Sequence, residues 1–439
     1  TTMIAEFTIE NFLSIRSEQK ISFVATRDLF MSDEYYYTMP DGTKLLKLGI
    51  IYGANASGKT NILNALDFFK HIMTDAPLKK SDEIDAVPFL LDNNSKNEHT
   101  LMGLVFYLNE VKHTIKIEYD NQRIYSESLI VASEKKPITL YKRNYDEATD
   151  SSVISFSLKL GLSKDDQKAI IGNTINNCSV LAAFGKSNVQ ATRMNDVFEY
   201  LDFNIAQILA PSVSLSSYVK RKLIKDDDRS LKRFLIEILK LSDFNINDME
   251  IKSDEIAITP EMEDYIAQAP ILQEAKDETL KKGSFTRETL VFQHHTDAGL
   301  FTLPEDLESR GTMRFLGMGV ILRELLKKDR FIAIDEIESS IHYELLEYFI
   351  KLFVANSEKH SQLLCSTHDV NLLDENFIRR DTVWFTDKSS DGETIVSRLS
   401  DSHLHKNISP YNAYRQGKLV KLPFLGSLYL DKKLFDDEK

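Results

Sequence analysis

The residues with the clearest chemistry form the stretch GANASGKT at positions 53–60, directly after the apolar run LLKLGIIY. Two glycines separated by four residues and followed by lysine and threonine give the pattern of a phosphate-binding loop. Gly53 and Gly58 allow the sharp turn that points backbone N–H groups at phosphates. Lys59 is placed to pair with the β- and γ-phosphates, and the Thr60 hydroxyl to ligate Mg²⁺. The other predicted nucleotide contacts of the loop are Asn55, Ala56, Ser57 and Asn61. A nucleotide and Mg²⁺ are therefore the expected ligand and cofactor, and the loop alone leaves open which class of nucleotide-binding protein this is.

A second group of polar residues ends the apolar run in RFIAIDEIESSIH, positions 330–342. Four apolar residues followed by two acids predict a buried strand that delivers Asp335 and Glu336 to the ligand-binding edge of an α/β sheet. Asp335 is expected to hold the Mg²⁺ shell, and Glu336 to orient or deprotonate the attacking water. The structural alternative is an acidic strand end that leads into a helix, and the phosphate-binding loop upstream makes it the weaker one.

A third apolar run, in SQLLCSTHD (361–369), ends in Ser-Thr-His-Asp. A helix predicted in HYELLEYFIKLFVANSE separates this run from the Asp-Glu strand, so the two strands are expected to be parallel and to share one edge. His368 then faces the γ-phosphate. Cys365 is expected to be a small core residue of its strand.

The fourth group, LESRGTMRFLGMGVILRELL, lies just upstream of the Asp-Glu strand. Ser309 and Gly311 open a predicted helix, and serine at a helix start is ordinarily an N-cap. In this order along the chain, however, the group resembles the LSGGQ-type signature of ABC ATPases. That resemblance implies that Ser309 and Gly311 contact the γ-phosphate bound to a second subunit.

The elements that must position these groups can be predicted from periodicity. The run before the loop is typical of a strand buried on both faces, and NILNALDFFKHIM after it has helical spacing. The opening MIAEFTIENFLSI alternates apolar and polar residues and predicts a strand. Short β-like runs between 85 and 160 predict an antiparallel meander. From 163 to 283 the pattern predicts helices of ordinary length, with no long coiled-coil arm.

Composition and charge narrow the class of protein. The chain has 439 residues, of which 42% are hydrophobic and 28% charged, enough for one large or two moderate cores. A net charge of −13 argues against non-specific coating of nucleic acid. The basic stretch YVKRKLIK (218–225) is interpreted as a solvated helix face. No apolar run approaches a membrane span, and Cys178 and Cys365 lack metal-ligand spacing, so a cytoplasmic protein without a membrane partner is expected.

The four groups together resemble the ABC-class ATPases of the SMC-like and OLD-like group. The opening FTIENFLSIRS resembles the first strand of that group, and ESSIH (338–342) occupies the place of its D-loop, with His342 where many members carry histidine. The tail NISPYNAYRQGKLVKLPFLGSL resembles that of bacterial anti-phage defence ATPases of the PARIS and abortive-infection types. The signature differs from the usual one because Arg310 replaces a small residue. A Q-loop is not evident, with Gln122 and the loop 87–94 as competing candidates.

The resemblance implies an α/β fold, a P-loop ABC-type ATPase head with a mixed sheet, an antiparallel β-meander and an inserted helical subdomain. The expected division is residues 3–160 and 286–439 for the two parts of the head and 161–285 for the helical insertion. The resemblance also implies a head-to-tail dimer, or a higher even oligomer, with two ATP molecules between the loop of one subunit and the signature of the other. ATP would close this dimer and hydrolysis would open it.

Two functions from different classes remain open. The leading hypothesis is an anti-phage defence ATPase that senses a phage protein and controls a separately encoded effector, such as a nuclease or a Toprim protein. It is motivated by the tail and by the roughly seventy residues after His368, too few for a Toprim domain. The alternative is a DNA-repair ATPase of the RecF or SMC-like type whose ATP-dependent dimer binds DNA. A transporter ATPase is third. The two histidines of DSHLHKN (401–407) are interpreted as a surface loop.

Overall fold

The computed structural model describes residues 1–268, 276, 280–402, 404–405 and 408–421. Its contacts divide the chain into two compact units, each built from separated segments. Unit 1 contains residues 1–211, 328–337 and 354–439, and unit 2 contains residues 212–327 and 338–353. The chain therefore leaves unit 1 and returns to it twice.

Most of the groups predicted to bind nucleotide belong to a five-stranded sheet in unit 1 and the loops at its edge. In sheet order its strands are β14 (Phe331–Ile334), β15 (Gln362–Thr367), β5 (Leu48–Gly53), β16 (Val383–Lys388) and β17 (Thr394–Arg398). The first four strands are parallel and β17 is antiparallel to β16. Every residue of β14, β15 and β5 is buried, as their continuous apolar runs predict. The outer edge of β14 is covered by the segment 205–209, which makes parallel bridges to it.

A seven-stranded antiparallel sheet forms the second layer of unit 1 and contains the predicted meander. Its order is β10 (Ser151–Phe156), β9 (Ile138–Asp146), β8 (Ile124–Val131), β7 (Val111–Tyr119), β6 (Thr100–Leu108), β1 (Thr2–Glu10) and β2 (Gln19–Ser22). Helix α2 (Lys59–Thr74) packs against both β1 and β5. Phe69 of α2 meets Phe7 of β1 edge to face, with ring centroids 5.8 Å apart. The predicted opening strand and meander are confirmed, and together they cover the helix that follows the phosphate-binding loop.

Unit 1 also contains several smaller elements. They are the hairpin β3 (Tyr36–Thr38) and β4 (Lys44–Leu46) and the helices α1 (Ser32–Tyr35), α3 (Lys164–Asn173), α4 (Val180–Gly185), α5 (Thr192–Glu199) and α12 (Pro410–Arg415). A single π-helical stretch, Tyr200–Asn204, continues α5. Both cysteines of the chain are buried free thiols. The burial of Cys365 agrees with its predicted place in the core.

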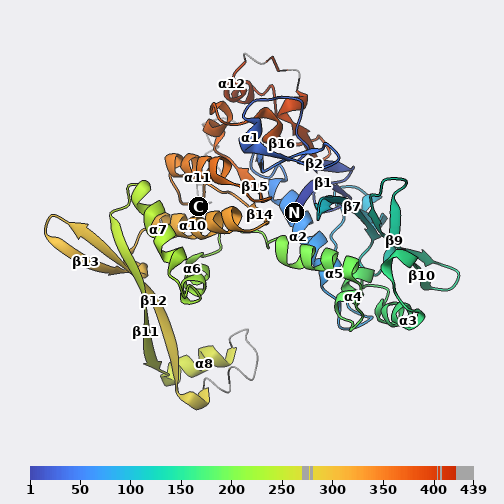
Figure 1. Cartoon of the computed structure of the whole chain (residues 1–439), viewed down its shortest axis with the longest axis horizontal. Coiled ribbons are helices and arrows are strands. Elements are labelled where there is room, and N and C mark those ends of the chain that lie inside the picture. The colour runs from blue at the N-terminus through green and yellow to red at the C-terminus, as the bar shows by residue number, and fades with distance from the viewer. Residues whose placement is uncertain (269–275, 277–279, 403, 406–407, 422–439) are drawn as a thin grey trace, which may run out of the picture. The chain divides into compact units, whose positions relative to one another are not determined.

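Unit 2 combines helices with a three-stranded sheet. Its elements are α6 (Ser216–Ile224), α7 (Ser230–Leu241), β11 (Ile246–Ala257), α8 (Pro260–Gln268), β12 (Ser284–Thr296), β13 (Gly299–Pro304), α10 (Arg310–Lys327) and most of α11 (Tyr343–Asn356). Helix α10 packs against α6 and α7, and in Figure 1 the β11–β12 hairpin extends away from these helices. At one contact Gly317 of α10 lies so close to Leu215 that an added Cβ would be 2.4 Å from a leucine carbon.

The structure differs from the sequence prediction in a helical stretch and in the domain limits. The stretch 163–283, predicted as helical, contains the twelve-residue strand β11, which pairs with β12 in an antiparallel ladder. The contact-based units also do not follow the predicted domain limits, because residues 161–211 pack in unit 1 and residues 286–327 in unit 2. Parts of the helix predicted around 262–282 and of the C-terminal tail lie outside the described residues.

The buried cation Lys47, next to β5, gives the stability of the protein a testable pH dependence. Lys47 precedes β5 and is 3% exposed, and its Nζ donates to the carbonyl of Ser357 at 2.7 Å. Burial lowers the pKa of Lys47 to about 8. The folded protein therefore holds fewer protons than the unfolded chain between pH 8 and the ordinary lysine pKa, so its stability rises with pH in that window.

We expect the free energy of unfolding to rise by on the order of 1 kcal/mol between pH 7.5 and 9.5. The Lys47→Met variant should lose this rise, because the titrating group is gone. Urea unfolding at the two pH values measures both proteins. The Lys44→Met variant, in the preceding strand, retains Lys47 and should keep the rise; an equal rise in Lys47→Met would contradict the assignment.

Candidate functional site

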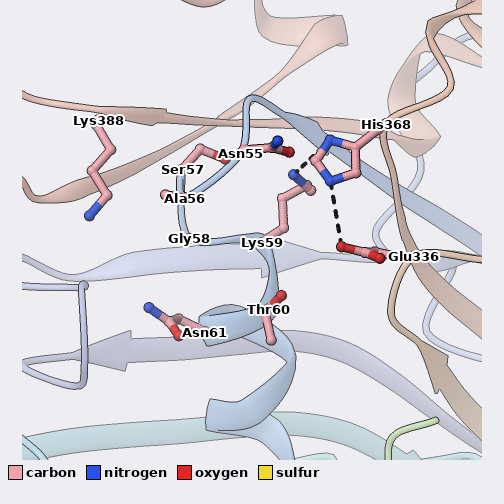
Figure 2. A pocket seen from close by; sticks show the side chains of 10 residues that line it. All are labelled: Asn55, Ala56, Ser57, Gly58, Lys59, Thr60, Asn61, Glu336, His368 and Lys388. Atoms are coloured by element: carbon pink, nitrogen blue, oxygen red, sulfur yellow. Dashed lines mark hydrogen bonds and ion pairs between the residues drawn. The ribbon is translucent and has the colours of Figure 1, made fainter. Parts of the chain in front are cut away.

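The predicted phosphate-binding loop lines a cavity of about 470 Å³ at the carboxyl edge of the five-stranded sheet. Figure 2 shows the side chains around it. The lining residues are Asn55, Ala56, Ser57, Gly58, Lys59, Thr60, Asn61, Glu336, His368 and Lys388. Three segments far apart in the sequence thus bring nine of the predicted site residues to one cavity. The edge is the one expected for ligands in an open α/β sheet.

The loop adopts a shape that only small residues permit. Gly58 has φ +107°, and a Cβ there would lie 2.1 Å from the Thr394 hydroxyl oxygen. A Cβ on Gly53 would lie 2.2 Å from Oγ1 of Thr386. Ala56 also has a positive φ of 62°, which is uncommon for a residue with a side chain. The two glycines therefore allow the loop to pass close to β16 and β17.

Two threonines of these neighbouring strands hold the loop. Thr386 Oγ1 and Ser57 Oγ lie 2.5 Å apart, and Thr394 donates its hydroxyl to the Ser57 carbonyl at 2.9 Å. Ser14, after β1, shares a hydrogen bond of 2.7 Å with the Thr394 hydroxyl and accepts from Asn61 at 2.6 Å. The loop is thus fixed by groups that come from both ends of the chain.

The Lys59 ammonium lies inside the curve of the loop and is 5% exposed as a residue. It donates to the carbonyls of Gly53 and Ala54 at 2.8 and 3.2 Å, and its Nζ lies 3.4 Å from Nδ1 of His368. A phosphate oxygen in the loop would meet a cation that is already directed by its own backbone. This is the position that the motif predicts.

Thr60 and Asp335 meet as the Mg²⁺ prediction requires. The Thr60 hydroxyl donates to Oδ2 of Asp335 at 2.8 Å, while Ser366 donates its hydroxyl to Oδ1 of the same carboxylate. Asp335 is 5% exposed. One hydroxyl and one carboxylate oxygen, with phosphate oxygens and waters, form the kind of hard oxygen set that Mg²⁺ prefers. Among the described residues there is no cluster of three or more metal-binding His, Cys, Asp or Glu side chains.

Glu336 and His368 face one another across the cavity, as the dashed line in Figure 2 shows. Their closest atoms, Oε1 and Nε2, are 3.7 Å apart. Because the Lys59 ammonium can only donate, its contact with Nδ1 requires Nδ1 of His368 to be the acceptor. Nε2, the other ring nitrogen, is the one nearer to the carboxylate of Glu336.

The backbone at Glu336 is strained in a way that fixes its carboxylate. Its φ is +45°, and its N–H donates to the Ser366 hydroxyl at 2.9 Å. A positive φ at a residue with a long side chain persists only where the surroundings hold it. The side chain remains 44% exposed, so water can reach it. This is suited to a group that orients a water molecule.

Lys388 is a lining residue that the sequence interpretation missed. It ends β16, and Figure 2 shows its side chain on the side of the loop away from Glu336. No motif marks it, because its position depends on the parallel pairing of β16 with β5. Its ammonium adds a positive charge to the cavity on the side away from Glu336.

We expect Lys388→Ala to raise the KM for ATP about three- to tenfold with little change in kcat. The reason is that a positive charge on the side of the cavity away from Glu336 strengthens ground-state and transition-state binding equally. Steady-state phosphate release measures both constants. Lys418→Ala, at an exposed position outside the cavity, is the matched control; a fall in kcat with unchanged KM would contradict this placement.

The predicted signature residues belong to unit 2, whereas the cavity is in unit 1. Ser309 is exposed and caps α10, its Oγ accepting from the N–H of Thr312 at 3.0 Å. Arg310 is exposed beside it. Gly311 approaches ESSIH closely, since an added Cβ would lie 3.1 Å from the Ser340 carbonyl oxygen. The N-cap is confirmed, and the contact of Ser309 and Gly311 with a second subunit's nucleotide stays a prediction.

The remaining predicted positions lie outside the cavity lining. Gln122 is exposed in the turn between β7 and β8, and the loop 87–94 does not line the cavity either. The two Q-loop candidates therefore remain undecided. His342 is 81% exposed and pairs with Glu344. In the part of the chain that the structure describes, no helix combines the length and apolarity needed to cross a bilayer.

Several solved structures are distantly similar to this chain. The SMC head domain from Thermotoga maritima is 13% identical, with 90% of this chain and 98% of that chain covered and a TM-score of 0.41. A SmcHead bound to the C-winged helix domain of ScpA is 13% identical, with 94% of this chain and 99% of that chain covered and a TM-score of 0.41. An Smc head domain derived from Pyrococcus furiosus is 12% identical, with 91% of this chain and 97% of that chain covered and a TM-score of 0.38. None of the curated proteins matches the sequence significantly.

The sequence itself matches one family over residues 50–374. This interval is about three quarters of the chain and contains the phosphate-binding loop, Asp335, Glu336 and His368. The chain belongs to the family described as "AAA domain, putative AbiEii toxin, Type IV TA system".

Proposed function

We propose that this protein binds ATP at the cavity around Lys59 and hydrolyses it to ADP and phosphate. The observation that carries the proposal is the convergence of three groups on one cavity. Lys59 is placed for the phosphates, Thr60 with Asp335 for Mg²⁺, and Glu336 with His368 for the attacking water. Each group does what phosphoryl transfer requires, because that reaction depends on positioning and on stabilising charge.

The chain's own residues would divide the chemistry as follows. The loop N–H groups and Lys59 bind the phosphates, and Glu336 accepts a proton from, or orients, the water that attacks the γ-phosphorus. His368 lies beside Glu336, with its Nε2 3.7 Å from Oε1, and would contribute to the charge environment of that carboxylate. Mg²⁺, when bound by Thr60 and Asp335, would neutralise part of the charge on the phosphate oxygens.

ATP is proposed to bring two copies together head to tail, each cavity being completed by Ser309 and Gly311 of the other copy. The exposure of Ser309 at the start of α10 supports this arrangement, since a helix N-terminus attracts phosphate. Light scattering with ATP and with ADP tests it. A dimer with ATP and a monomer with ADP are expected; the same mass in both would contradict the switch.

The switch is proposed to control a separately encoded effector in bacterial anti-phage defence, with a phage protein as trigger. The support is the family description, which names a toxin and a toxin–antitoxin system. Plaque assays on cells that carry the gene with its chromosomal neighbours test the role. Protection that disappears with Lys59→Ala is expected, and protection that survives this substitution would contradict an ATP-driven role.

The DNA-repair alternative predicts that duplex DNA stimulates ATP hydrolysis, which the defence function does not predict. The net charge of −13 opposes a duplex-binding surface. We therefore expect added duplex DNA to leave the hydrolysis rate unchanged at physiological salt. A several-fold stimulation would favour the DNA-repair function over the defence function.

A further inference from the structure

A second cavity, of about 190 Å³, lies in unit 1 at the C-terminal end of α2. Its apolar walls are Phe68, Ile72, Ala76, Pro77, Leu78 and Ile84, and its polar walls are His71, Asp75, Glu83, Asp85 and Asn177. The cavity is separate from the phosphate-binding loop, which lies at the other end of the same helix. Nothing in the proposed ATPase chemistry uses it.

The charges around this cavity are mainly negative. Asp75 pairs with His71, its Oδ2 lying 2.7 Å from the imidazole Nδ1. Glu83 and Asp85 are exposed and have no ion-pair partner among the residues that the structure describes. The carbonyl end of α2 adds partial negative charge. The cavity therefore favours a cation.

One buried side chain in the cavity lining has an unused hydrogen-bond acceptor. Asn177 is 5% exposed, and its Nδ2 donates to the carbonyls of Lys79 and Asp82 at 3.0 and 2.7 Å. Because carbonyl oxygens only accept, these two bonds fix which end of the amide is which. Its Oδ1 is left as a buried acceptor with no hydrogen-bond partner. Such an atom costs free energy unless a donor reaches it.

The wall that carries Asn177 is rigid. Arg143, which is fully buried, donates to the carbonyls of Ile175, Asn176 and Cys178 at 3.3, 3.1 and 2.6 Å. These bonds hold the backbone on both sides of Asn177. The asparagine is thus presented by a fixed segment, which is what a preorganised binding site requires.

The volume of this cavity and the residues that line it indicate what kind of ligand it would bind. The described residues contain no acidic cluster that could hold a metal ion, and the volume is below the ~300 Å³ at which small-molecule sites begin. We propose that the cavity binds a lysine or arginine side chain of a partner protein. The aliphatic stem would lie on Phe68, Ile72 and the exposed Leu78. The charged head would donate to Asn177 Oδ1 and face Glu83 and Asp85.

The test uses the full-length protein without nucleotide, so that its failure is independent of the ATPase proposal. The probes are the N-acetyl, N′-methylamide derivatives of lysine, arginine and norleucine, with putrescine as a free diamine. Saturation-transfer NMR at low salt measures their dissociation constants. We expect the lysine or the arginine derivative to bind at least tenfold more tightly than norleucine, which shares the stem and lacks the charge.

A double variant removes the charge without touching the core. Glu83→Gln with Asp85→Asn changes two exposed carboxylates and should weaken binding of the charged derivatives at least threefold. Glu134→Gln with Glu147→Gln, exposed in other loops of unit 1, should leave it unchanged. The proposal is overturned if neither charged derivative binds at 10 mM, if norleucine binds as well as they do, or if putrescine binds tenfold more tightly, which would assign the site to free polyamines.

Discussion

Glu336→Gln is expected to lower the rate of ATP hydrolysis at least a hundredfold while ATP binding is retained. The amide keeps the size and the polarity of the side chain, but it cannot accept a proton from water or hold it as a carboxylate does. The contacts proposed for Lys59 with the phosphates and for Thr60 with Mg²⁺ do not involve Glu336. Phosphate release measures turnover, and fluorescence of a labelled ATP analogue measures binding.

The same variant should hold the two copies together, because ATP that is bound and not hydrolysed cannot release them. Size-exclusion chromatography with light scattering in ATP and Mg²⁺ should show a dimer that persists for hours. Glu358→Gln, at an exposed position outside the cavity, is the control and should cycle as the unchanged protein does. Hydrolysis by Glu336→Gln at the original rate would show that another group activates the water.

Lys59→Ala is expected to weaken ATP binding at least a hundredfold and so to abolish detectable hydrolysis. The substitution removes the one buried ammonium inside the phosphate-binding loop, and a charge-assisted contact of this kind is worth roughly 3 kcal/mol. It also removes the donor to Gly53 and Ala54, so the loop loses its internal support.

Lys59→Met separates the loss of charge from the loss of volume, because methionine fills most of the space of the lysine stem. Both variants should fail to bind ATP, with circular dichroism and thermal unfolding confirming that they fold. Lys80→Ala, in the exposed loop after α2, should bind normally. Tight ATP binding by Lys59→Met would show that the loop backbone alone holds the phosphates.

The groups that form the site were predictable because each ends a local pattern. A buried apolar run followed by Gly-Lys-Thr, Asp-Glu or Ser-Thr-His states both the strand and the edge at which its polar residues emerge. The predicted parallel pairing of the Asp-Glu strand with the Ser-Thr-His strand is confirmed in the register of Ile334 with Cys365. The P-loop helix is confirmed as α2.

The residues that support the loop were not predictable in the same way. Strand β16 pairs with β5, and β17 pairs with β16. Only this pairing brings Thr386 and Thr394 to the loop and Lys388 to the cavity. Ser14 arrives from the other end of the chain. Such contacts depend on sheet order, which one sequence does not state. Strand β11 was missed for a related reason: its exposed, charged residues have low strand propensity, and its partner β12 stabilises it.

Glu336 lies close to a point where the chain passes from one unit to the other. Unit 1 holds residues 328–337 between two segments of unit 2, and its boundary falls directly after Ile337, one residue beyond Glu336. Consecutive Cα atoms are 3.8 Å apart, so this connection has almost no slack. The φ of +45° at Glu336 lies two residues before unit 2 resumes, so a substitution that alters the backbone at residue 338 would act close to the residue proposed to orient the water.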